Sequence, residues 1–450
     1  MPAPSIVFNS STGSDTAASG AGPSTALSGT AASLNASTTV TLSVDSPNLS
    51  GVAVDGTACL WVDTTTGRQF SAITAIDNTA KTVTVANAYT VTESGRNWGI
   101  GGKRKDFNNT NSRKLFSADM GSGWEVVTET DQDVSSTAIT VSAGLNTVIR
   151  GDSEVIRRVI TQSSNTAIFT VTATPAQFRN LDFRNSSVSK TSSSGIQCSA
   201  SGGPQISAIN CTFGGSSNTL RYGFLRSNGT PLFTAISCDF HNCEQSISML
   251  GSTCTAINCR FKDNSVNAIL FSGGSNCICT ILGCLFVGNI GTISHGSSTS
   301  TFTLQIANCT FDSNIGNVIA ATSTSSGPGQ GGYIVNSVFS NNTGWALDLR
   351  AEAFKLCMFE KFNNFFNNTS GNWNGFSIDA TDLTLDPQYT NPAGGDYSIG
   401  NNLKSVGFPK SDTPIGINSA TYSFVDIGAA QSQSGGGSRP RNPFTQGVIG

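Results

Sequence analysis

The sequence predicts an all-β protein whose largest part is a parallel β-helix, a solenoid with coils of about 25 residues. Three observations lead to this prediction: the composition, a short motif that recurs along the chain, and the lack of an amphipathic helical pattern. Only 12% of the 450 residues are charged, about half the usual share. The abundant Gly, Ser, Thr and Asn favour strands, caps and turns over helices.

The composition also excludes several classes of protein. With 26 Phe residues and a formal net charge of −3, the chain can bury a core and does not resemble a disordered protein. The charge balance does not fit a nucleic-acid-binding protein, and no apolar run is long enough to span a membrane. We therefore expect neither a nucleic-acid partner nor a membrane span.

The first residues lack the charged and apolar regions of a secretory signal peptide. The rest of the chain is polar and uncharged, as in an extracellular surface protein. A virion protein, made in the host cytoplasm and released by lysis, fits both observations, so we expect localisation in a virion. The alternative is an extracellular protein whose signal peptide has been removed.

The N-terminal part is predicted to contain two regions. Residues 1–36 are of low complexity and are interpreted as an extended arm that orders against a partner or a neighbouring subunit; the alternative is a flexible tail. Residues 37–115 show short alternating segments separated by Gly, Asn and Asp, which predicts a small β domain of hairpins that anchors the protein. The basic segment 103–114 is interpreted as a solvated linker face.

The repeat motif Asn-x-x-Phe is the strongest signal, and it predicts a β-helix over residues 116–390. Successive aligned Phe residues are 30, 27, 21, 25, 25, 28 and 27 positions apart. Leucine-rich repeats would need a Leu framework, and propeller blades need longer periods. The aligned residues are Phe183, Phe213, Phe240, Phe261, Phe286, Phe311, Phe339 and Phe366.

In five consecutive coils a Cys stands two residues before the Phe. Residues i and i+2 of a strand face the same side, so both side chains should point into the coil. Parallel, in-register Cβ vectors suit a disulfide poorly, and the spacing is not that of a metal site. We therefore predict reduced, buried thiols, no metal and no cofactor. These residues are Cys211, Cys238, Cys259, Cys284 and Cys309.

Residues 386–431 resemble the closing segment of right-handed parallel β-helix surface proteins of the pectate-lyase-like superfamily. The resemblance rests on Asp386-Pro387-Gln388-Tyr389, on the later Asn-Pro and Gly-Asp-Tyr stretches, and on an Asp-Ile-Gly-Ala stretch near the end. The N-terminal stretches 13–23 and 99–104 resemble leaders of phage-encoded virion β-helix proteins. These resemblances imply a right-handed parallel β-helix and a closing segment at 391–431. Residues 432–450 are rich in Ser and Gly and then basic, and are interpreted as a flexible tail or one that a partner orders.

Many members of this superfamily cleave polysaccharides, which requires converging acidic residues. Asp182 and Asp239 point outward at equivalent coil positions, two coils apart. His241 lies beside Asp239 and Arg260. These four residues are the candidates for an alternative function as a polysaccharide lyase or glycoside hydrolase. We do not expect the chain to be an enzyme, because no larger acidic cluster converges.

The preferred interpretation is a structural virion protein of a bacteriophage: a tail spike, a fibre or a capsid-decorating protein. Its N-terminal arm and β domain would contact other virion proteins, and a homotrimer is a further expectation. The outer face would bind host-surface glycans, with Trp345 and Trp373 as stacking platforms. The alternatives are a carbohydrate-active enzyme and a secreted bacterial adhesin.

Overall fold

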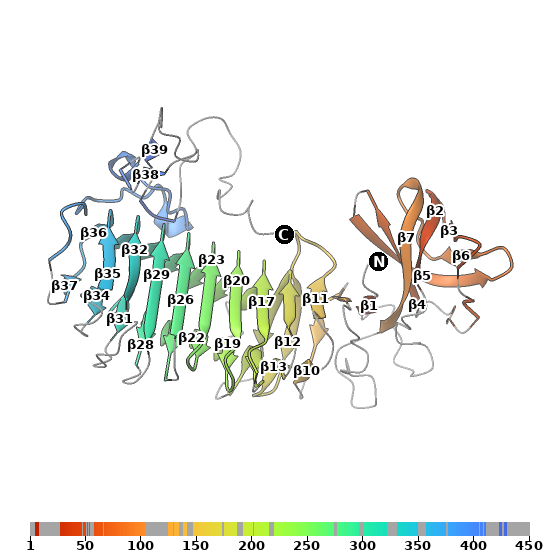
Figure 1. The fold of residues 1–450 in the computed structure, drawn as a ribbon, viewed down its shortest axis with the longest axis horizontal. Coiled ribbons are helices and arrows are strands. Elements are labelled where there is room, and N and C mark those ends of the chain that lie inside the picture. The colour runs from red at the N-terminus through yellow and green to blue at the C-terminus, as the bar shows by residue number, and fades with distance from the viewer. Residues whose placement is uncertain are drawn as a thin grey trace. The chain divides into compact units, whose positions relative to one another are not determined.

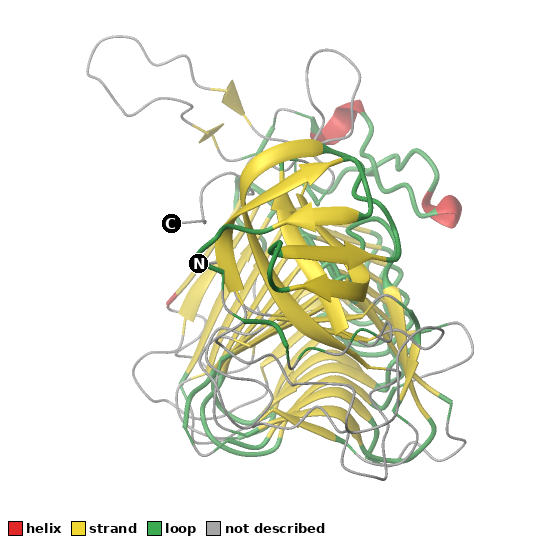
Figure 2. Cartoon of the chain, turned by 90° about the vertical axis from the view of Figure 1, so that its right-hand side faces the viewer, coloured by secondary structure: helices red, strands yellow, loops and turns green. Residues whose placement is uncertain are grey.

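A computed structural model of the chain describes residues 5–8, 28–104 and 125–429, except for short gaps. The gaps are at 47, 51, 53, 55–57, 66, 129, 135–137, 142–146, 173–174, 187–191, 201, 216–219, 274–276, 297–300, 322–330, 350–356, 375–376, 405, 408, 411–422 and 425–426. The described chain is strand and loop, with two short 3-10 helices, η2 (Pro392–Gly394) and η3 (Asn401–Leu403), that are red in Figure 2. Within it, no helix is long and apolar enough to cross a membrane.

The chain folds into two compact units, residues 1–197 with 209–211, and residues 198–208 with 212–450. The first unit contains a closed antiparallel barrel, in which the strands pair in the order β2, β3, β6, β5, β4 and β7, and β7 pairs again with β2. Trp98 is fully buried in the barrel core. The predicted small β domain is therefore confirmed. Its strands are β2 (Ser28–Asn35), β3 (Thr39–Thr41), β4 (Ala58–Thr64), β5 (Gly67–Asp77), β6 (Thr82–Val85) and β7 (Thr92–Arg104).

The barrel begins earlier than the sequence suggested, because β2 lies within the stretch 1–36 that was interpreted as an arm. A further strand of this stretch, β1 (Ser5–Phe8), pairs in parallel with the end of β7 and with β8 (Glu125–Thr128). Strand β8 is the first strand of the coils and pairs in parallel with β11. Strand β1 therefore joins the barrel to the coils by main-chain hydrogen bonds.

Each coil contributes one strand to each of three parallel sheets, here called S1, S2 and S3 in chain order (Figure 1). In the first unit, S1 contains β8, β11 (Thr147–Gly151) and β14 (Ala176–Arg179). S2 contains β9 (Gln132–Asp133), β12 (Arg158–Gln162) and β15 (Leu181–Asn185), and S3 contains β10 (Ile139–Val141) and β13 (Ala167–Val171). Strands β16 (Ser194–Cys198) and β17 (Gln205–Ile209) have residues in both units.

The second unit is built of coils with the same three strands, which confirms the predicted parallel β-helix. S1 contains β20 (Leu232–Ile236), β23 (Thr253–Ile257), β26 (Cys277–Leu282), β29 (Phe302–Ala307), β32 (Gly331–Val335) and β35 (Met358–Lys361). S2 contains β18 (Thr212–Gly214), β21 (Asp239–His241), β24 (Arg260–Lys262), β27 (Leu285–Val287), β30 (Thr310–Asp312), β33 (Val338–Ser340) and β36 (Asn364–Phe366). S3 contains β19 (Tyr222–Arg226), β22 (Gln245–Met249), β25 (Asn267–Phe271), β28 (Ile293–His295), β31 (Ile319–Ala321), β34 (Trp345–Leu349) and β37 (Gly371–Trp373).

The Phe residues of the repeat stack inside the coils, as predicted. In the second unit the ring centroids of successive coils are 4.5 to 5.1 Å apart, with nearly parallel planes. In the last coil the stacked ring is Phe365, whereas the sequence alignment assigned Phe366. The left-handed corner residue of this coil is Phe362, with φ 56°, and not Asn363, so Phe365 pairs with Phe339. The stack contains Phe213, Phe240, Phe261, Phe286, Phe311, Phe339 and Phe365.

The Asn of the repeat motif stands at the corner between S1 and S2, where the backbone is left-handed. Its φ is 54° at both Asn258 and Asn308, and Gly283 takes the same place with φ 62°. Asn and Gly tolerate this conformation better than other residues. The motif therefore combines a turn residue with the buried ring that follows it.

The buried thiols form a hydrogen-bonded column. The Cys259 N–H donates to the Sγ of Cys284 (3.3 Å), and the Cys284 N–H donates to the Sγ of Cys309 (3.5 Å). In later coils the column continues with Ser337, whose Oγ accepts from the Cys309 N–H (3.2 Å). The five Cys residues of the motif are buried thiols and not halves of disulfides, as predicted. At the corner between S2 and S3, burial raises the pKa of Cys243 to about 12, so this thiol is protonated at neutral pH.

An amide ladder follows at the corner between S2 and S3. Asn289 shows its pattern: its Oδ1 accepts from the Nδ2 of Asn264 (2.7 Å), and its Nδ2 donates to the Oδ1 of Asn314 (2.9 Å). The Nδ2 of Asn289 also donates to the Phe261 carbonyl (3.0 Å). Because these buried amides hydrogen-bond to one another, they replace the hydrogen bonds that they would make with water. The ladder contains Asn264, Asn289, Asn314, Asn342 and Asn368.

The C-terminal segment first extends S2 and then folds back over its outer face. Leu383 forms a parallel bridge with Asn364, next to the last S2 strand. Ile399, Leu403 and Ile427 then pack on Val338 of β33. Near the end of the described chain, β38 (Pro409–Lys410) pairs with β39 (Ser423–Phe424). The segment therefore extends S2 beyond the last coil and also covers part of the outer face of S2.

Candidate functional site

The outer face of S2 brings three of the sequence-predicted residues together. Asp239 of β21 and Arg260 of β24 are register partners, and the Arg260 Nε lies 3.0 Å from Asp239 Oδ1. His241 is two residues beyond Asp239 on the same face and is half-buried. The Arg260 side chain is 49% exposed and that of Asp239 is 24% exposed. The three residues therefore form a small polar surface that solvent reaches.

The fourth candidate, Asp182, belongs to the first unit. Its Oδ2 accepts from the Nε and the terminal Nη2 of Arg184, at 3.1 and 2.6 Å. Each of the two predicted carboxylates is thus engaged by an arginine. Glycoside hydrolysis uses two carboxyl groups about 5 to 9.5 Å apart, one of them protonated as the acid. Neither ion pair by itself supplies such an arrangement.

The two tryptophans proposed for glycan binding lie on the last S3 strands. Trp373 of β37 is only 8% exposed and pairs with Leu347, so it belongs to the core at that end. Trp345 of β34 is half-buried, and its ring lies across the backbone of Gly371, where an added Cβ would approach within 2.5 Å of the ring. Trp345 is therefore the one of the pair that offers an accessible ring surface.

A buried carboxylate stands beside Trp345. Asp348 is fully buried and accepts from the Nδ2 of Asn317 (2.6 Å) and of Asn374 (2.8 Å). The Oδ1 of Asn317 in turn accepts from the Trp345 N–H (3.1 Å). Partnered amides compensate the desolvation of the carboxylate. These contacts fix the backbone that carries the Trp345 ring.

A second acidic group closes the last coil, and the sequence pattern gave no sign of it. Glu360 of β35 is 6% exposed and accepts from the side chain of Asn363. Burial, together with the nearby Asp382 carboxylate, raises the pKa of Glu360 to about 9. Asp382 accepts from the N–H groups of Asn363 (2.9 Å) and Asp379 (2.8 Å), and burial raises its pKa as well. Glu360 and Asp382 meet only through long-range folding, so local patterns could not reveal them.

The neighbouring Asp379 behaves in the opposite way. Its hydrogen bond with Lys361, at 2.6 Å, lowers the pKa of Asp379 to about 2. The Thr381 N–H also donates to this carboxylate, at 2.9 Å. The cluster therefore combines a neutral Glu360 with an ion pair at its rim. Within the described residues no group of three or more His, Cys, Asp or Glu side chains is arranged to hold a metal ion.

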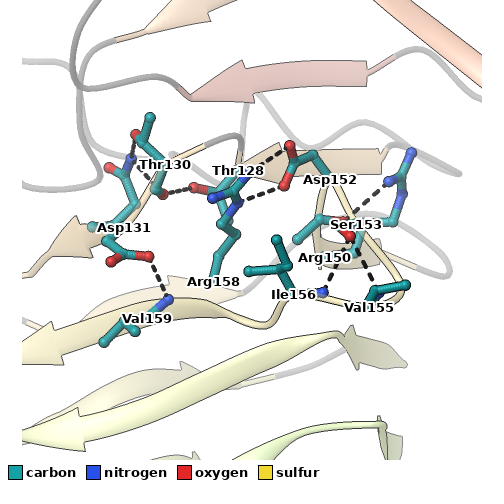
Figure 3. Close-up of polar contacts among 12 residues, drawn as sticks. Thr128, Thr130, Asp131, Arg150, Asp152, Ser153, Val155, Ile156, Arg158 and Val159 are labelled. Atoms are coloured by element: carbon teal, nitrogen blue, oxygen red, sulfur yellow. Dashed lines mark hydrogen bonds and ion pairs between the residues drawn. The ribbon is translucent and has the colours of Figure 1, made fainter.

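A rigid turn in an early coil presents two apolar side chains (Figure 3). Arg158 binds Asp152 through two hydrogen bonds, at 2.5 and 2.8 Å, across the base of the turn. The Oγ of Ser153 accepts from the N–H groups of Val155 and Ile156, both at 3.1 Å. Val155 is 91% exposed and Ile156 is 60% exposed. The sequence analysis did not single out this turn, since two apolar residues within a polar stretch are not distinctive.

Comparisons with known proteins find only distant structural similarity. No family model matches the chain, and no curated protein matches it. Among solved structures, a pectin methylesterase, PemA from Erwinia chrysanthemi, aligns with 66% of this chain and 97% of its own, at 10% identity and a TM-score of 0.21. The tailspike protein gp49 from Pseudomonas phage LKA1 aligns with 80% of this chain and 65% of its own, at 8% identity and a TM-score of 0.20. Similarities of this size carry no statement about activity.

Proposed function

We propose that the chain is a structural protein of a bacteriophage particle, either a spike, a fibre or a capsid-decorating protein. The continuity of its internal ladders is the observation that carries this proposal. The stack from Phe213 to Phe365 and the amide ladder from Asn264 to Asn368 each link consecutive coils. Opening one coil breaks contacts with both neighbours, so the coils resist local unfolding. Durability outside a cell is what a particle surface requires.

Two further features support the proposal. The barrel is a separate small core tied to the first coils through β1, an arrangement suited to anchoring. The buried thiols agree with folding in a reducing cytosol before release by lysis. We propose that the barrel and the N-terminal residues contact other virion proteins, and that the coils project as a homotrimer.

The test is quantitative mass spectrometry of particles purified by density gradient from the cells that make this chain. The proposal predicts a constant ratio of this chain to the major coat protein across the particle peak. Recovery of the chain only in the soluble fraction, with none in the particle peak, would contradict the proposal.

We propose host-surface glycan binding as the finer role, with Trp345 as the stacking residue. Replacing Trp345 by Ala should weaken binding to cell-wall glycan at least about tenfold, because stacking on the accessible part of a half-buried aromatic ring is lost. Trp373→Phe is the matched variant: Trp373 lies in the core, so glycan affinity should be unchanged. Equal affinity of the wild type and the Trp345 variant would contradict this role.

The enzyme alternative is favoured by one observation, the convergence of Asp239, His241 and Arg260 on adjacent coils. Incubation with capsular or cell-wall polysaccharide, followed by chromatography of the products, tests it. Released oligosaccharide that disappears in Asp239→Asn but persists in Asp182→Asn would establish this surface as catalytic. Intact polysaccharide after prolonged incubation would contradict the enzyme alternative and favour the structural role.

A further inference from the structure

The outer face of S1 is an ordered, uncharged surface. Over β20, β23, β26, β29 and β32 the strands are paired without a register shift, so the outward positions form three straight columns, in which Gly331 is buried and carries no side chain. The columns are Leu232, Thr253, Ile278, Thr303 and Gly331; Thr234, Thr255, Thr280, Gln305 and Tyr333; and Ile236, Ile257, Leu282, Ala307 and Val335. We call these fifteen positions the S1 face.

None of the fifteen positions is charged, whereas 12% of the residues of the whole chain are charged. The outer face of S2 in the same coils differs, since it carries the Asp239–Arg260 pair and Lys262. Charged residues are therefore available to outward positions of this chain but absent from the S1 face. Along S1 the first charged residue beyond it is Lys361, the register partner of Val335.

The side chains of the S1 face are suited to burial. Most are Thr, Ile or Leu, and β-branched side chains lose little rotamer freedom when packed. Leu232 is 39% exposed and Ile278 is 37% exposed, and Phe359, next to Tyr333 in the following strand, is 47% exposed. The polar groups also find partners within the face, because Thr280 donates to Gln305 at 2.9 Å. Single exposed apolar residues are ordinary, but a contiguous uncharged array marks an interaction surface.

We propose that the S1 face is the surface through which two copies of this chain associate. A second copy is the partner that this chemistry fits best, because identical uncharged faces meet without opposing like charges or desolvating any charge. Flat sheets pack face to face at about 10 Å through such side chains. An acidic glycan or a nucleic acid would find no countercharge here.

The area of the S1 face determines how strongly two copies are expected to associate. Five strands and five residues span about 24 Å by 17 Å, or roughly 400 Å². A standard interface buries about 800 Å² on each partner. The S1 face therefore predicts reversible, concentration-dependent association, which neighbouring copies on a particle would strengthen through their high local concentration.

Sedimentation velocity of the full chain over roughly 1 to 200 µM, the range expected for a small interface, tests the proposal. The wild type should shift from monomer to dimer, because an interface between two identical faces closes with two copies. The double variant Leu232→Lys/Ile278→Lys should remain monomeric, with the dissociation constant raised at least tenfold. The matched control is Ile290→Lys/Ile315→Lys, which changes two residues that are 48% and 52% exposed outside the S1 face and should associate like the wild type. Circular dichroism and melting temperature confirm that each variant is folded.

A mixing experiment makes the test specific for face-to-face contact. A Leu232→Glu/Ile278→Glu variant should also be monomeric alone, and mixing it with the Lys variant should restore association. A monomeric wild type, an equal loss in the control variant, or a mixture that stays monomeric would each overturn the proposal. The inference adds an interface to the proposed structural role. A monomeric chain found in particles would refute the interface alone, and an associating chain absent from particles would refute the role alone.

Discussion

At the scale of single residues, the rings of the Phe stack are the largest contributors to the core. Phe286 is at its centre, with ring centroids 4.5 Å from Phe261 and 4.7 Å from Phe311. Replacing Phe286 by Ala should lower the free energy of unfolding by about 3–5 kcal/mol, because a cavity is left between two rings. Urea denaturation measures this change. Phe359→Ala, at a side chain that is 47% exposed, should cost less than about 1 kcal/mol, and equal losses for the two variants would contradict the buried stack.

Cys284 shows that a thiol of this column serves as a hydrogen-bond acceptor as well as an apolar group. Cys284→Ala removes the acceptor of the buried Cys259 N–H and should cost about 1–3 kcal/mol beyond the lost packing. Cys284→Ser keeps an acceptor, as Ser337 does two places further along the column, and should be the more stable variant. The midpoints of urea denaturation compare the two. A serine variant less stable than the alanine variant would show that the thiol acts only by packing.

The sequence could predict which residues point inward but not all of what they do there. The two-residue spacing of Cys and Phe determines the face, because strands alternate. The hydrogen bonds of the column depend on the distance between coils, which no local pattern encodes. The buried pair of Glu360 and Asp382 was missed for the same reason. Asp382 lies beyond the last S2 strand, outside the repeat, so the repeat pattern does not place it next to Glu360.

At the scale of elements, the closing coil should be sensitive to pH. The pKa of Glu360 is raised to about 9 in the folded chain, so the folded state keeps a proton that the unfolded state releases above about pH 4.5. This contribution to stability is complete below pH 4.5 and is lost as pH rises through about 9, by at most about 1.4 kcal/mol per pH unit. Glu360→Gln, which stays neutral, should match the wild type at pH 5 and melt at a higher temperature at pH 9.

The control for this experiment is Glu93→Gln in the barrel. A hydrogen bond with Thr65 lowers the pKa of Glu93, so its carboxylate stays ionised throughout this range. Its substitution should shift the melting temperature equally at pH 5 and pH 9. A pH-independent shift for Glu360→Gln would show that Glu360 is ionised in the folded chain.

Element boundaries were predicted less well than element types. The alternation of Thr39, Val40 and Thr41 correctly predicted a half-buried strand. The low-complexity segment Ser28–Asn35 nonetheless forms barrel strand β2, because small residues suit close approach: an added Cβ at Gly29 would lie 2.8 Å from the indole Nε1 of Trp98. Packing against Trp98 in the folded barrel, which the local composition does not reveal, therefore decides that this segment forms a strand.

At the scale of the whole molecule, β1 links the barrel to the coils. It pairs with Lys103 and Arg104 at the end of β7 and with the whole of β8. Deleting residues 2–8 should leave both cores intact but uncouple them, so calorimetry should show two thermal transitions where the full chain shows fewer. A deletion of the C-terminal residues 432–450 serves as the control and should leave the transitions unchanged. An unchanged thermogram for the N-terminal deletion would show that β1 carries no coupling.

The account depends most on the claim that the coils form one cooperative stack, and trypsin digestion of the native chain tests this most directly. Arg260 and Lys262 lie on β24 with side chains 49% and 51% exposed, so the enzyme can reach them but can cut only if the strand leaves the sheet. We predict that mass spectrometry finds the bonds after Arg260 and Lys262 intact after prolonged digestion, and cut promptly once urea unfolds the chain. Rapid cleavage at either site under native conditions would contradict the stack.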